Sequence, residues 1–447
     1  MKRYLSFFSA LGIFLLALAV RITYNVKTGM HYVPRPDSIF YTDIATNLVK
    51  SGCYCIYSTQ QTVDRAPFWP GLLTILYFFT GPRTDYARLM LCFIGSGTCV
   101  LIFLFVKEIF GQGLAVLAGL FAAIYAQLYI YDGFLYSESV FIFLTLAFCY
   151  SLYHLYLRLK QGYTLRHNIW LNLLCALFLT ATSLTRPNGL LYAALLLPWG
   201  IVLCLTRTLP WAQTFKHIIL LIVVSLVLIT PWTIRNYIVS KGSFIPIAVG
   251  DGTVLMGAYN SSILNPADTN DYQKWMPPQY VDAKVTDPYP EGNCAATCEV
   301  ARENVYKQYA MHWIRTHMEK MPTLLEAHFL NLWLPDTHEA DMPIDSYPNQ
   351  AGKAVVQQQK SEPPVLFAFA FLGILLTFRK WREQLFFYLL FLSTIGEAVY
   401  FFGIPRFRAP LEPLLVFFAA GTLWALLTLV RLSTQRLRKT PLSASTQ

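Results

Sequence analysis

The sequence predicts an all-α polytopic membrane protein with about ten transmembrane helices, juxtamembrane helices at the outer face and a small extracytoplasmic cap. Hydrophobic residues make up 55% of the 447 positions and charged residues only 13%, which is too apolar for the surface of a soluble protein of this size. Uncharged runs such as 168–185 and 363–378 approach the roughly 20 residues that a helix needs to cross a bilayer.

The first predicted element is a helix over about 5–22, which could also be a signal peptide. We expect a retained anchor, because no convincing small-x-small cleavage site follows the apolar run. The other spans are placed by charge, since Lys and Arg concentrate on the cytoplasmic side. With the N-terminus inside, both termini are cytoplasmic and the further spans are 86–106, 113–130, 139–157, 168–185, 188–206, 215–231, 363–378, 384–403 and 409–430.

The charge distribution also assigns the short apolar stretch 68–79. Counting it as a crossing would place the basic residues of 158–167 outside, so we expect an interfacial helix that lies on the membrane. The same inside-positive sorting explains the net charge of +10, and no nucleic-acid partner is expected.

The chain is predicted to divide into three parts. Residues 1–233 form an N-terminal transmembrane module that contains the first outer loop, 24–85. Residues 234–362 form the extracytoplasmic cap, and 363–447 form the C-terminal helices and a cytoplasmic tail. Functional residues are expected in the two polar outer segments, because exposed loops on a rigid scaffold carry most binding and catalytic groups.

Four of the nine cysteines lie in these outer segments: Cys53, Cys55, Cys294 and Cys298. In an oxidising compartment they could form two disulfides in three connectivities. A zinc site is the alternative, but the Cys-x-Cys spacing of the first pair is unusual for zinc and no His lies nearby. Disulfides are therefore expected.

Two acids at the predicted outer ends are candidates for chemistry. Asp37 stands beyond the first helix and begins a helical pattern, so it could be an N-cap or a catalytic carboxylate. Glu138 directly precedes the apolar run VFIFLTLAF. A carboxylate at the bilayer edge is costly unless it is paired, although it could simply complement the helix N-terminus.

Arginines also occur on the outer side, where the inside-positive trend should make them scarce. Arg65, Arg186, Arg235 and Arg406 each stand at a predicted outer end. Each one alone could be a snorkelling or capping residue. Several arginines that converge on a site of low dielectric would instead bind a phosphate group.

The chain resembles the GT-C membrane glycosyltransferases, in the bacterial branch related to protein O-mannosyltransferases and the lipid A aminoarabinose transferase. The matching phrases follow the family's order over most of the chain: DSIFYTDIATNLVKSGCY, DRAPFWPGLL, LYSESVFIFL, TRPNGLL, TPWTIRNYIVSKGSFIPIAVGDGTVLMGAYN and PRFRAPLEPLLVF. The resemblance implies that Asp37 is the catalytic base and that Glu138 belongs to the same site. It also implies that Arg65 binds the carrier phosphate, with a looser fit for Arg186, Arg235 and Arg406.

The function implied by the resemblance is sugar transfer from a polyprenyl-phosphate donor to an acceptor, which is a protein, lipid A or an envelope glycan. Displacement at the anomeric carbon would invert its configuration, and a divalent metal ion bridging Asp37 and Glu138 is one arrangement that the family allows. The expected location is the bacterial inner membrane, with the site facing the periplasm or the cell exterior. A glycine-rich nucleotide loop is not expected, because the GSG at 95–97 lies inside an apolar helix.

The alternative is a transporter or flippase of a lipid-linked saccharide. Such a protein would need polar or broken helices through the middle of the membrane. Charged residues are scarce at that depth in the predicted spans and gather at the outer ends, which favours the enzyme.

The predicted topology can be tested by cysteine labelling. A cysteine placed in the 158–166 loop should resist an impermeant thiol reagent, because that loop is expected to be cytoplasmic. A cysteine placed in 260–279 should react. Labelling in the opposite sense would move the candidate site to the cytoplasm.

Overall fold

The computed structural model describes residues 2–28, 30, 37–56, 60–264, 273–278, 281, 295–335 and 350–439. Within these residues the regular elements are helices and no strand occurs, as the sequence predicts. The α-helices are α1 Lys2–Thr28, α2 Asp37–Ser51, α3 Phe68–Thr80, α4 Thr84–Phe110, α5 Gln112–Ile124, α6 Ala126–Tyr129, α7 Tyr131–Phe134, α8 Glu138–Lys160, α9 Leu165–Thr185, α10 Gly189–Leu205, α11 Trp211–Val239, α12 Asp251–Ala258, α13 Ala296–Thr316, α14 Met321–Leu332, α15 Gln350–Leu376, α16 Trp381–Tyr400 and α17 Glu412–Lys439. A 3₁₀ segment, η6 Pro405–Leu411, links α16 to α17.

The described part of the chain contains six helices that are long and apolar enough to cross a membrane. They are α1, α4, α8, α9, α11 and the continuous stretch Pro405–Arg431, which joins η6 and α17. Two bent pairs, bent by 66° within 112–134 and by 62° within 350–400, bring the number to eight if each is one span. The protein is therefore a multi-pass membrane protein, but the count of ten is not confirmed. Helix α10 is apolar but short, and the break at Tyr125 divides the span predicted over 113–130.

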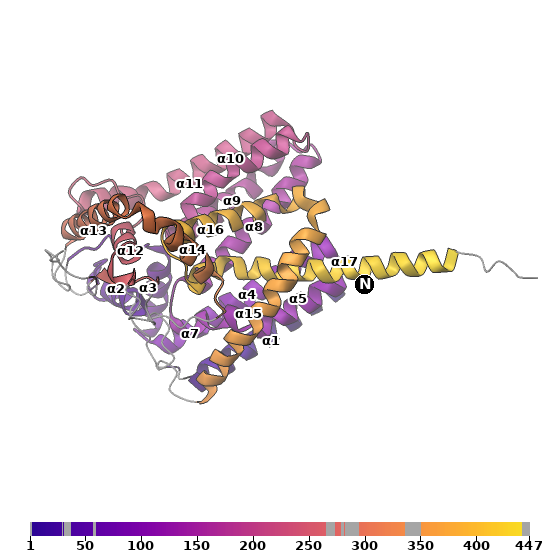
Figure 1. Ribbon diagram of the computed structural model, residues 1–447, viewed down its shortest axis with the longest axis horizontal. Coiled ribbons are helices and arrows are strands. Elements are labelled where there is room, and N and C mark those ends of the chain that lie inside the picture. The colour runs from indigo at the N-terminus through magenta and orange to yellow at the C-terminus, as the bar shows by residue number, and fades with distance from the viewer. Residues whose placement is uncertain are drawn as a thin grey trace, which may run out of the picture.

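The long helices form a bundle, and short helices gather at one of its ends. Figure 1 shows α2, α3, α12 and α13 together at this end, while the end of α17 projects from the opposite side. The core of the bundle joins α1, α4, α5, α8 and α17 through buried aliphatic and aromatic side chains. Helix α3 covers the predicted interfacial stretch, and its Trp69 donates a 3.0 Å hydrogen bond to the carbonyl of Leu135.

Two helices cross the boundaries expected between the three parts of the chain. Helix α11 continues to Val239, and α15 already begins at Gln350. The first outer loop is bound to the cap segment through backbone hydrogen bonds from Val249 to Val63, 3.0 Å, and from Ala296 to Gln61, 3.1 Å. The described residues of these two polar segments are therefore joined at this end of the bundle.

An ion pair is buried inside the N-terminal half of the bundle. Arg21 Nε lies 2.8 Å from Asp132 Oδ2, and both side chains are fully buried. Asp132 lies in α7, where the sequence suggested a loop. Gly95 allows this contact, because a Cβ at that position would lie 2.7 Å from Arg21 Nε. The glycine at this position thus serves helix packing.

Candidate functional site

Arg406 joins the two predicted acids. Its Nη2 lies 2.7 Å from Asp37 Oδ2, and its Nε contacts Glu138 Oε1. Asp37 is the first residue of α2 and Glu138 the first residue of α8, while Arg406 lies in η6. One guanidinium therefore holds together three segments that are far apart in the sequence.

Two more arginines complete this cluster. Arg65 Nη2 lies 3.2 Å from Asp37 Oδ1, and its Nη1 lies 2.5 Å from the neighbouring Asp64. Arg186, which follows α9, contacts Glu138 through Nη1. We call Asp37, Asp64, Arg65, Glu138, Arg186 and Arg406 the carboxylate–arginine cluster. Its three arginines balance its three carboxylates, so the cluster is formally neutral.

The cluster is partly exposed, and Glu138 is its most buried member. The side chains of Asp37 and Arg65 are 21% and 20% exposed, whereas Glu138 is 1% exposed. Aromatic rings fix two of the guanidinium groups: Arg406 lies 4.3 Å from the centroid of Tyr136, and Arg65 lies 4.6 Å from that of Phe40. Cation–π contacts of this kind orient an arginine without using its hydrogen-bond donors.

The charge state of Asp37 follows from its neighbours. Burial alone would raise the pKa of this carboxyl, but the charges of Arg406 and Arg65 outweigh burial and lower the pKa to about 2. Each of its two oxygens is paired with a guanidinium. These ion pairs occupy the whole carboxylate, and the catalytic role of Asp37 stays a prediction.

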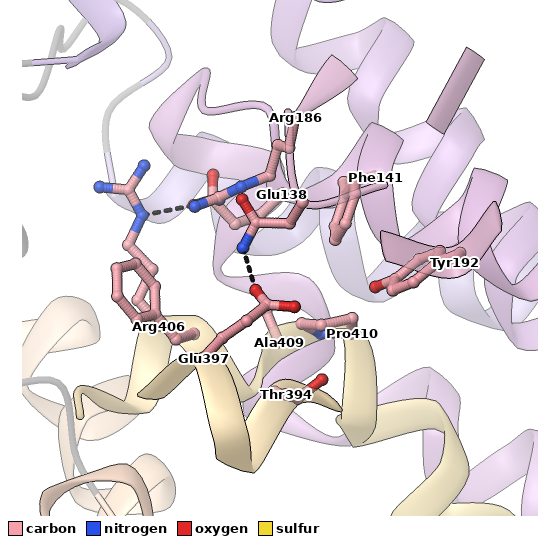
Figure 2. Close-up of a pocket in the computed structure, with 11 residues that line it drawn as sticks. Glu138, Phe141, Arg186, Tyr192, Thr394, Glu397, Arg406, Ala409 and Pro410 are labelled. Carbon is pink, nitrogen blue, oxygen red and sulfur yellow. Dashed lines mark hydrogen bonds and ion pairs between the residues drawn. The ribbon is translucent and has the colours of Figure 1, made fainter. Parts of the chain in front are cut away.

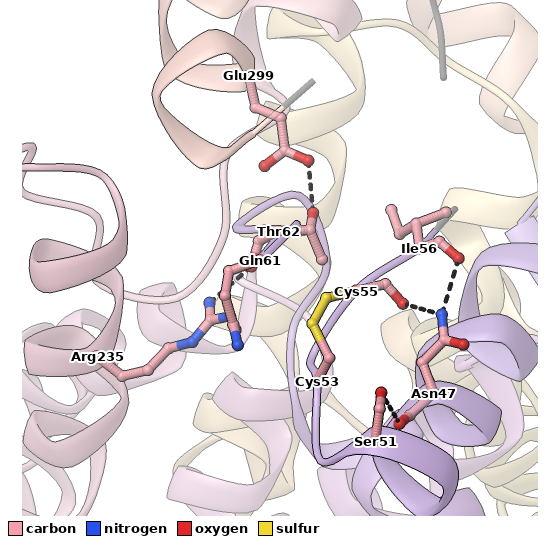
Figure 3. Close-up of a disulfide and its surroundings, with 9 residues drawn as sticks. All are labelled: Asn47, Ser51, Cys53, Cys55, Ile56, Gln61, Thr62, Arg235 and Glu299. Atoms are coloured by element: carbon pink, nitrogen blue, oxygen red, sulfur yellow. Dashed lines mark hydrogen bonds between the residues drawn. A yellow bond between two sulfur atoms is a disulfide. The ribbon is translucent and has the colours of Figure 1, made fainter. Parts of the chain in front are cut away.

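Arg235, the fourth predicted phosphate ligand, lies apart from the cluster. Its Nη1 donates a 2.6 Å hydrogen bond to the carbonyl of Thr62, and its Nη2 bonds the side chain of Gln61 (Figure 3). Its guanidinium carbon lies 5.0 Å from the Tyr54 ring and 4.8 Å from the Trp232 ring. Arg235 thus holds the loop that leads to Arg65, and phosphate binding by Arg235 stays a prediction.

The same loop is held from the cap side by Glu299 of α13. Its carboxylate accepts hydrogen bonds from Thr62 Oγ1, 2.6 Å, and from the backbone N–H of Val63, 2.7 Å (Figure 3). Burial, with the charge of Asp64 added, outweighs these hydrogen bonds and raises the pKa of Glu299 to about 7. The loop before Arg65 is therefore fixed between a membrane helix and the cap.

The outer cysteines lie near this loop. Cys53 and Cys55 form a disulfide, and Asn47 supports the turn with a 2.9 Å hydrogen bond to the carbonyl of Cys55 (Figure 3). Cys298 is also disulfide-bonded, whereas Cys294 lies outside the described residues. The free cysteines among the described residues are all buried, and they are Cys92, Cys99, Cys149, Cys175 and Cys204.

A guanidinium lies where the predicted metal ion would bridge Asp37 and Glu138. Such an ion would take an oxygen from each carboxylate, and Arg406 already contacts Asp37 Oδ2 and Glu138 Oε1. Among the residues that the structure describes, no three His, Cys, Asp or Glu side chains are grouped so that they could hold a metal. The cation between the two acids is a guanidinium.

Sequence reasoning missed a further acid next to the cluster, Glu397. Glu397 of α16 and Asn188, which precedes α10, form a hydrogen bond and line a pocket together with Glu138 (Figure 2). The sequence does contain a feature that points to Glu397, since it is an isolated acid within the predicted span 384–403. An acid inside a membrane span usually marks a functional site.

The fold can be compared with solved structures. No protein-family model and no curated protein sequence matches the chain. The oligosaccharyltransferase AglB from Archaeoglobus fulgidus, in complex with an inhibitory peptide and a dolichol-phosphate, superposes with a TM-score of 0.60 at 15% identity, covering 100% of this chain and 53% of AglB. A structure of the Archaeoglobus fulgidus oligosaccharyltransferase with Zn and sulfate gives 0.52 at 12% identity, covering 95% of this chain and 50% of that one.

ArnT from Cupriavidus metallidurans, bound to undecaprenyl phosphate, gives a TM-score of 0.46 at 16% identity, with 96% of this chain and 81% of ArnT covered. The chain spans about half the length of the oligosaccharyltransferase, with 53% covered, and shares its fold. The predicted GT-C fold is confirmed.

The stability of the cap should depend on the protonation of Glu299. The unperturbed pKa is 4.5 and the folded-state pKa is about 7, so the folded protein keeps a proton that the unfolded chain releases. The free energy of unfolding should therefore fall as pH rises from about 4.5 to 7, by on the order of 1 to 3 kcal/mol. Glu299→Gln should flatten this pH dependence in thermal unfolding of the detergent-solubilised protein between pH 5 and 8.

The exposed Glu326 of α14 provides the control. Glu326→Gln should unfold with the pH dependence of the unmodified protein. If Glu299→Gln also unfolds with the pH dependence of the unmodified protein, Glu299 is not the group that keeps its proton on folding.

Proposed function

We propose that this chain, which has the GT-C fold, is a glycosyltransferase that moves a sugar from a polyprenyl-phosphate donor to an acceptor hydroxyl or amine. The site is the carboxylate–arginine cluster, at the outer face of the bacterial inner membrane. The observation that carries the proposal is Arg406, which touches both acids at the end of the bundle where the juxtamembrane helices lie.

The similar structures support the donor class. AglB was solved with a dolichol-phosphate, which is a polyprenyl phosphate, and with an inhibitory peptide. In that protein the fold therefore accommodates both a lipid phosphate and a peptide. In this chain the arginines that could meet such a phosphate are Arg65, Arg186 and Arg406, since guanidinium groups bind phosphate oxygens bidentately.

The paired state of Asp37 constrains the mechanism. A carboxylate with a pKa of about 2 is a weak general base, because proton transfer is most efficient when the pKa lies near the working pH. A donor phosphate that binds Arg65 and Arg406 competes with Asp37 for the same guanidinium groups. Donor binding therefore raises the pKa of Asp37 and makes it a stronger base.

In the transfer step, Asp37 takes the proton of the acceptor as the acceptor oxygen or nitrogen bonds to the anomeric carbon. The bond from that carbon to the phosphate oxygen breaks, and the phosphate leaves with both electrons. Attack opposite the leaving phosphate inverts the anomeric configuration.

The two roles are coupled through charge. The phosphate gains about one negative charge when the sugar leaves, and Asp37 loses its negative charge when it is protonated. Arg406 can then pair with the phosphate rather than with Asp37, and the net charge of the site stays nearly the same. Because Arg406 can exchange Asp37 for the phosphate, the cluster stabilises the negative charge on the leaving phosphate as that charge forms. This stabilisation is the electrostatic part of catalysis.

Asp37→Asn should abolish most transfer. Asn keeps the shape of Asp and caps a helix about as well, but it cannot take a proton, and a general base contributes about 10² to 10⁴ in rate. The measurement is transfer of labelled sugar from a polyprenyl phosphate by the purified variant, with its melting temperature recorded alongside.

Asp43→Asn is the matched control, because Asp43 lies on the same helix α2 and is half-buried outside the cluster. It should transfer sugar at a near-normal rate. A folded Asp37→Asn protein that turns over as fast as Asp43→Asn would remove Asp37 from catalysis and, with it, the main support for an enzyme.

Arg65→Gln should weaken the binding of polyprenyl phosphate. The lost charge-assisted hydrogen bond is worth roughly 1.5 to 3 kcal/mol, so the Kd should rise by about ten- to a hundred-fold. Arg83→Gln, which changes an exposed arginine paired with Asp85 before α4, should leave the Kd unchanged. If the two variants bind polyprenyl phosphate with equal affinity, Arg65 does not bind the phosphate and its role is structural.

A further inference from the structure

A pocket opens beside Glu138, between α8, α10, α16 and η6. Its space measures about 340 Å³ including the open mouth. Arg186 and Arg406 lie on one wall, and Glu397 extends toward them from α16 (Figure 2). Asp37 is not among the lining residues, so the pocket adjoins the proposed base without containing it.

The turn between α9 and α10 supplies a donor to each acid of the pocket. Arg186 contacts Glu138, and Asn188, two residues later, donates to Glu397 through Nδ2. This turn therefore fixes the two carboxylates relative to each other. Thr394 lies one turn before Glu397 on α16 and adds a hydroxyl to the same wall.

The polar groups of the pocket favour hydroxyl groups over a phosphate. Both arginines of the pocket contact Glu138, and Glu397 adds a second carboxyl group to the lining. A phosphate here would meet two carboxylates, whereas sugar hydroxyls can donate hydrogen bonds to them.

The remaining walls suit a sugar ring. Phe141 and Tyr192 lie about one turn inside α8 and α10 and line the pocket with aromatic surface (Figure 2). Aromatic walls with a few convergent polar groups are the usual lining of a small-molecule site. The pocket thus offers acceptors for hydroxyl groups at one end and flat apolar surface at the other.

We propose that this pocket binds the sugar of the donor through its hydroxyl groups, and that Glu397, held by Asn188, determines which sugar is accepted. The inference rests on the proposed function, because the sugar must remain attached to a phosphate at the neighbouring arginines. Arg406 lines the pocket and contacts Asp37, so it lies where the bond between sugar and phosphate would be broken.

The test compares two lipids, a polyprenyl phosphate and the same lipid carrying its sugar. For the unmodified protein the sugar should tighten binding. Glu397→Gln should reduce that advantage by about ten- to a hundred-fold, since a charge-assisted hydrogen bond is lost, while the Kd of the sugar-free lipid stays unchanged. Transfer, measured as kcat/KM, should fall by the same factor.

Two further variants distinguish a loss of sugar binding from a general loss of folding. Thr394→Val keeps the size of the side chain and should also weaken only the sugar-bearing lipid. Glu383→Gln, at the other end of α16, should behave as the unmodified protein in both measurements. A donor lacking the hydroxyl that meets Glu397 should lose no further affinity in Glu397→Gln, because the two changes remove one interaction.

The outcomes separate the inference from the proposed function. An unmodified protein that binds neither lipid contradicts both proposals. Normal transfer together with an unchanged preference for the sugar in Glu397→Gln and Thr394→Val overturns the sugar pocket alone. Equal loss of affinity for both lipids would also overturn it, since the effect would then lie on the phosphate or on the fold.

Discussion

The guanidinium of Arg406 is the interaction on which the site depends. It contacts Asp37, which lies 369 residues earlier, and Glu138, which lies 268 residues earlier. Each acid begins a helix, where a negative charge is favoured by the exposed backbone N–H groups. The site therefore exists only when the C-terminal helices have packed against the N-terminal half. Removing the guanidinium would leave two carboxylates facing each other with only Arg65 and Arg186 to balance them.

Around this contact the protein builds two different environments. On the side of Asp37, part of the cluster is open to solvent, and the loop before Arg65 is fixed by Arg235 from the membrane side and by Glu299 from the cap. On the side of Glu138, the carboxylate is buried and faces an aromatic-lined pocket. In the proposed reaction, the acceptor would meet Asp37 on the first side, and the sugar of the donor would lie in the pocket on the second.

Much of this arrangement could be predicted from the sequence. Apolar runs and basic clusters indicate the helices, and the outer acids and arginines indicate the site. The contacts of Arg406 could not be predicted locally, because they depend on how helices hundreds of residues apart pack. Arg235 illustrates the limit: its sequence context resembles that of the other arginines, yet its side chain stacks on Tyr54 and Trp232 and bonds a loop. The count of ten spans is not confirmed, because hydropathy does not reveal the bends within 112–134 and 350–400.

The buried pair of Arg21 and Asp132 also has a consequence for how the chain is made. Arg21 contacts the carbonyl of Ala123, which is 102 residues further along, and Asp132 follows later still. At roughly 5 to 20 residues per second, α1 waits on the order of 5 to 20 s for these partners. Until then an arginine in lipid costs at least about 2.5 to 3.5 kcal/mol. Helix α1 is synthesised first, but it therefore cannot reach its final packing until α5 and α7 have been inserted.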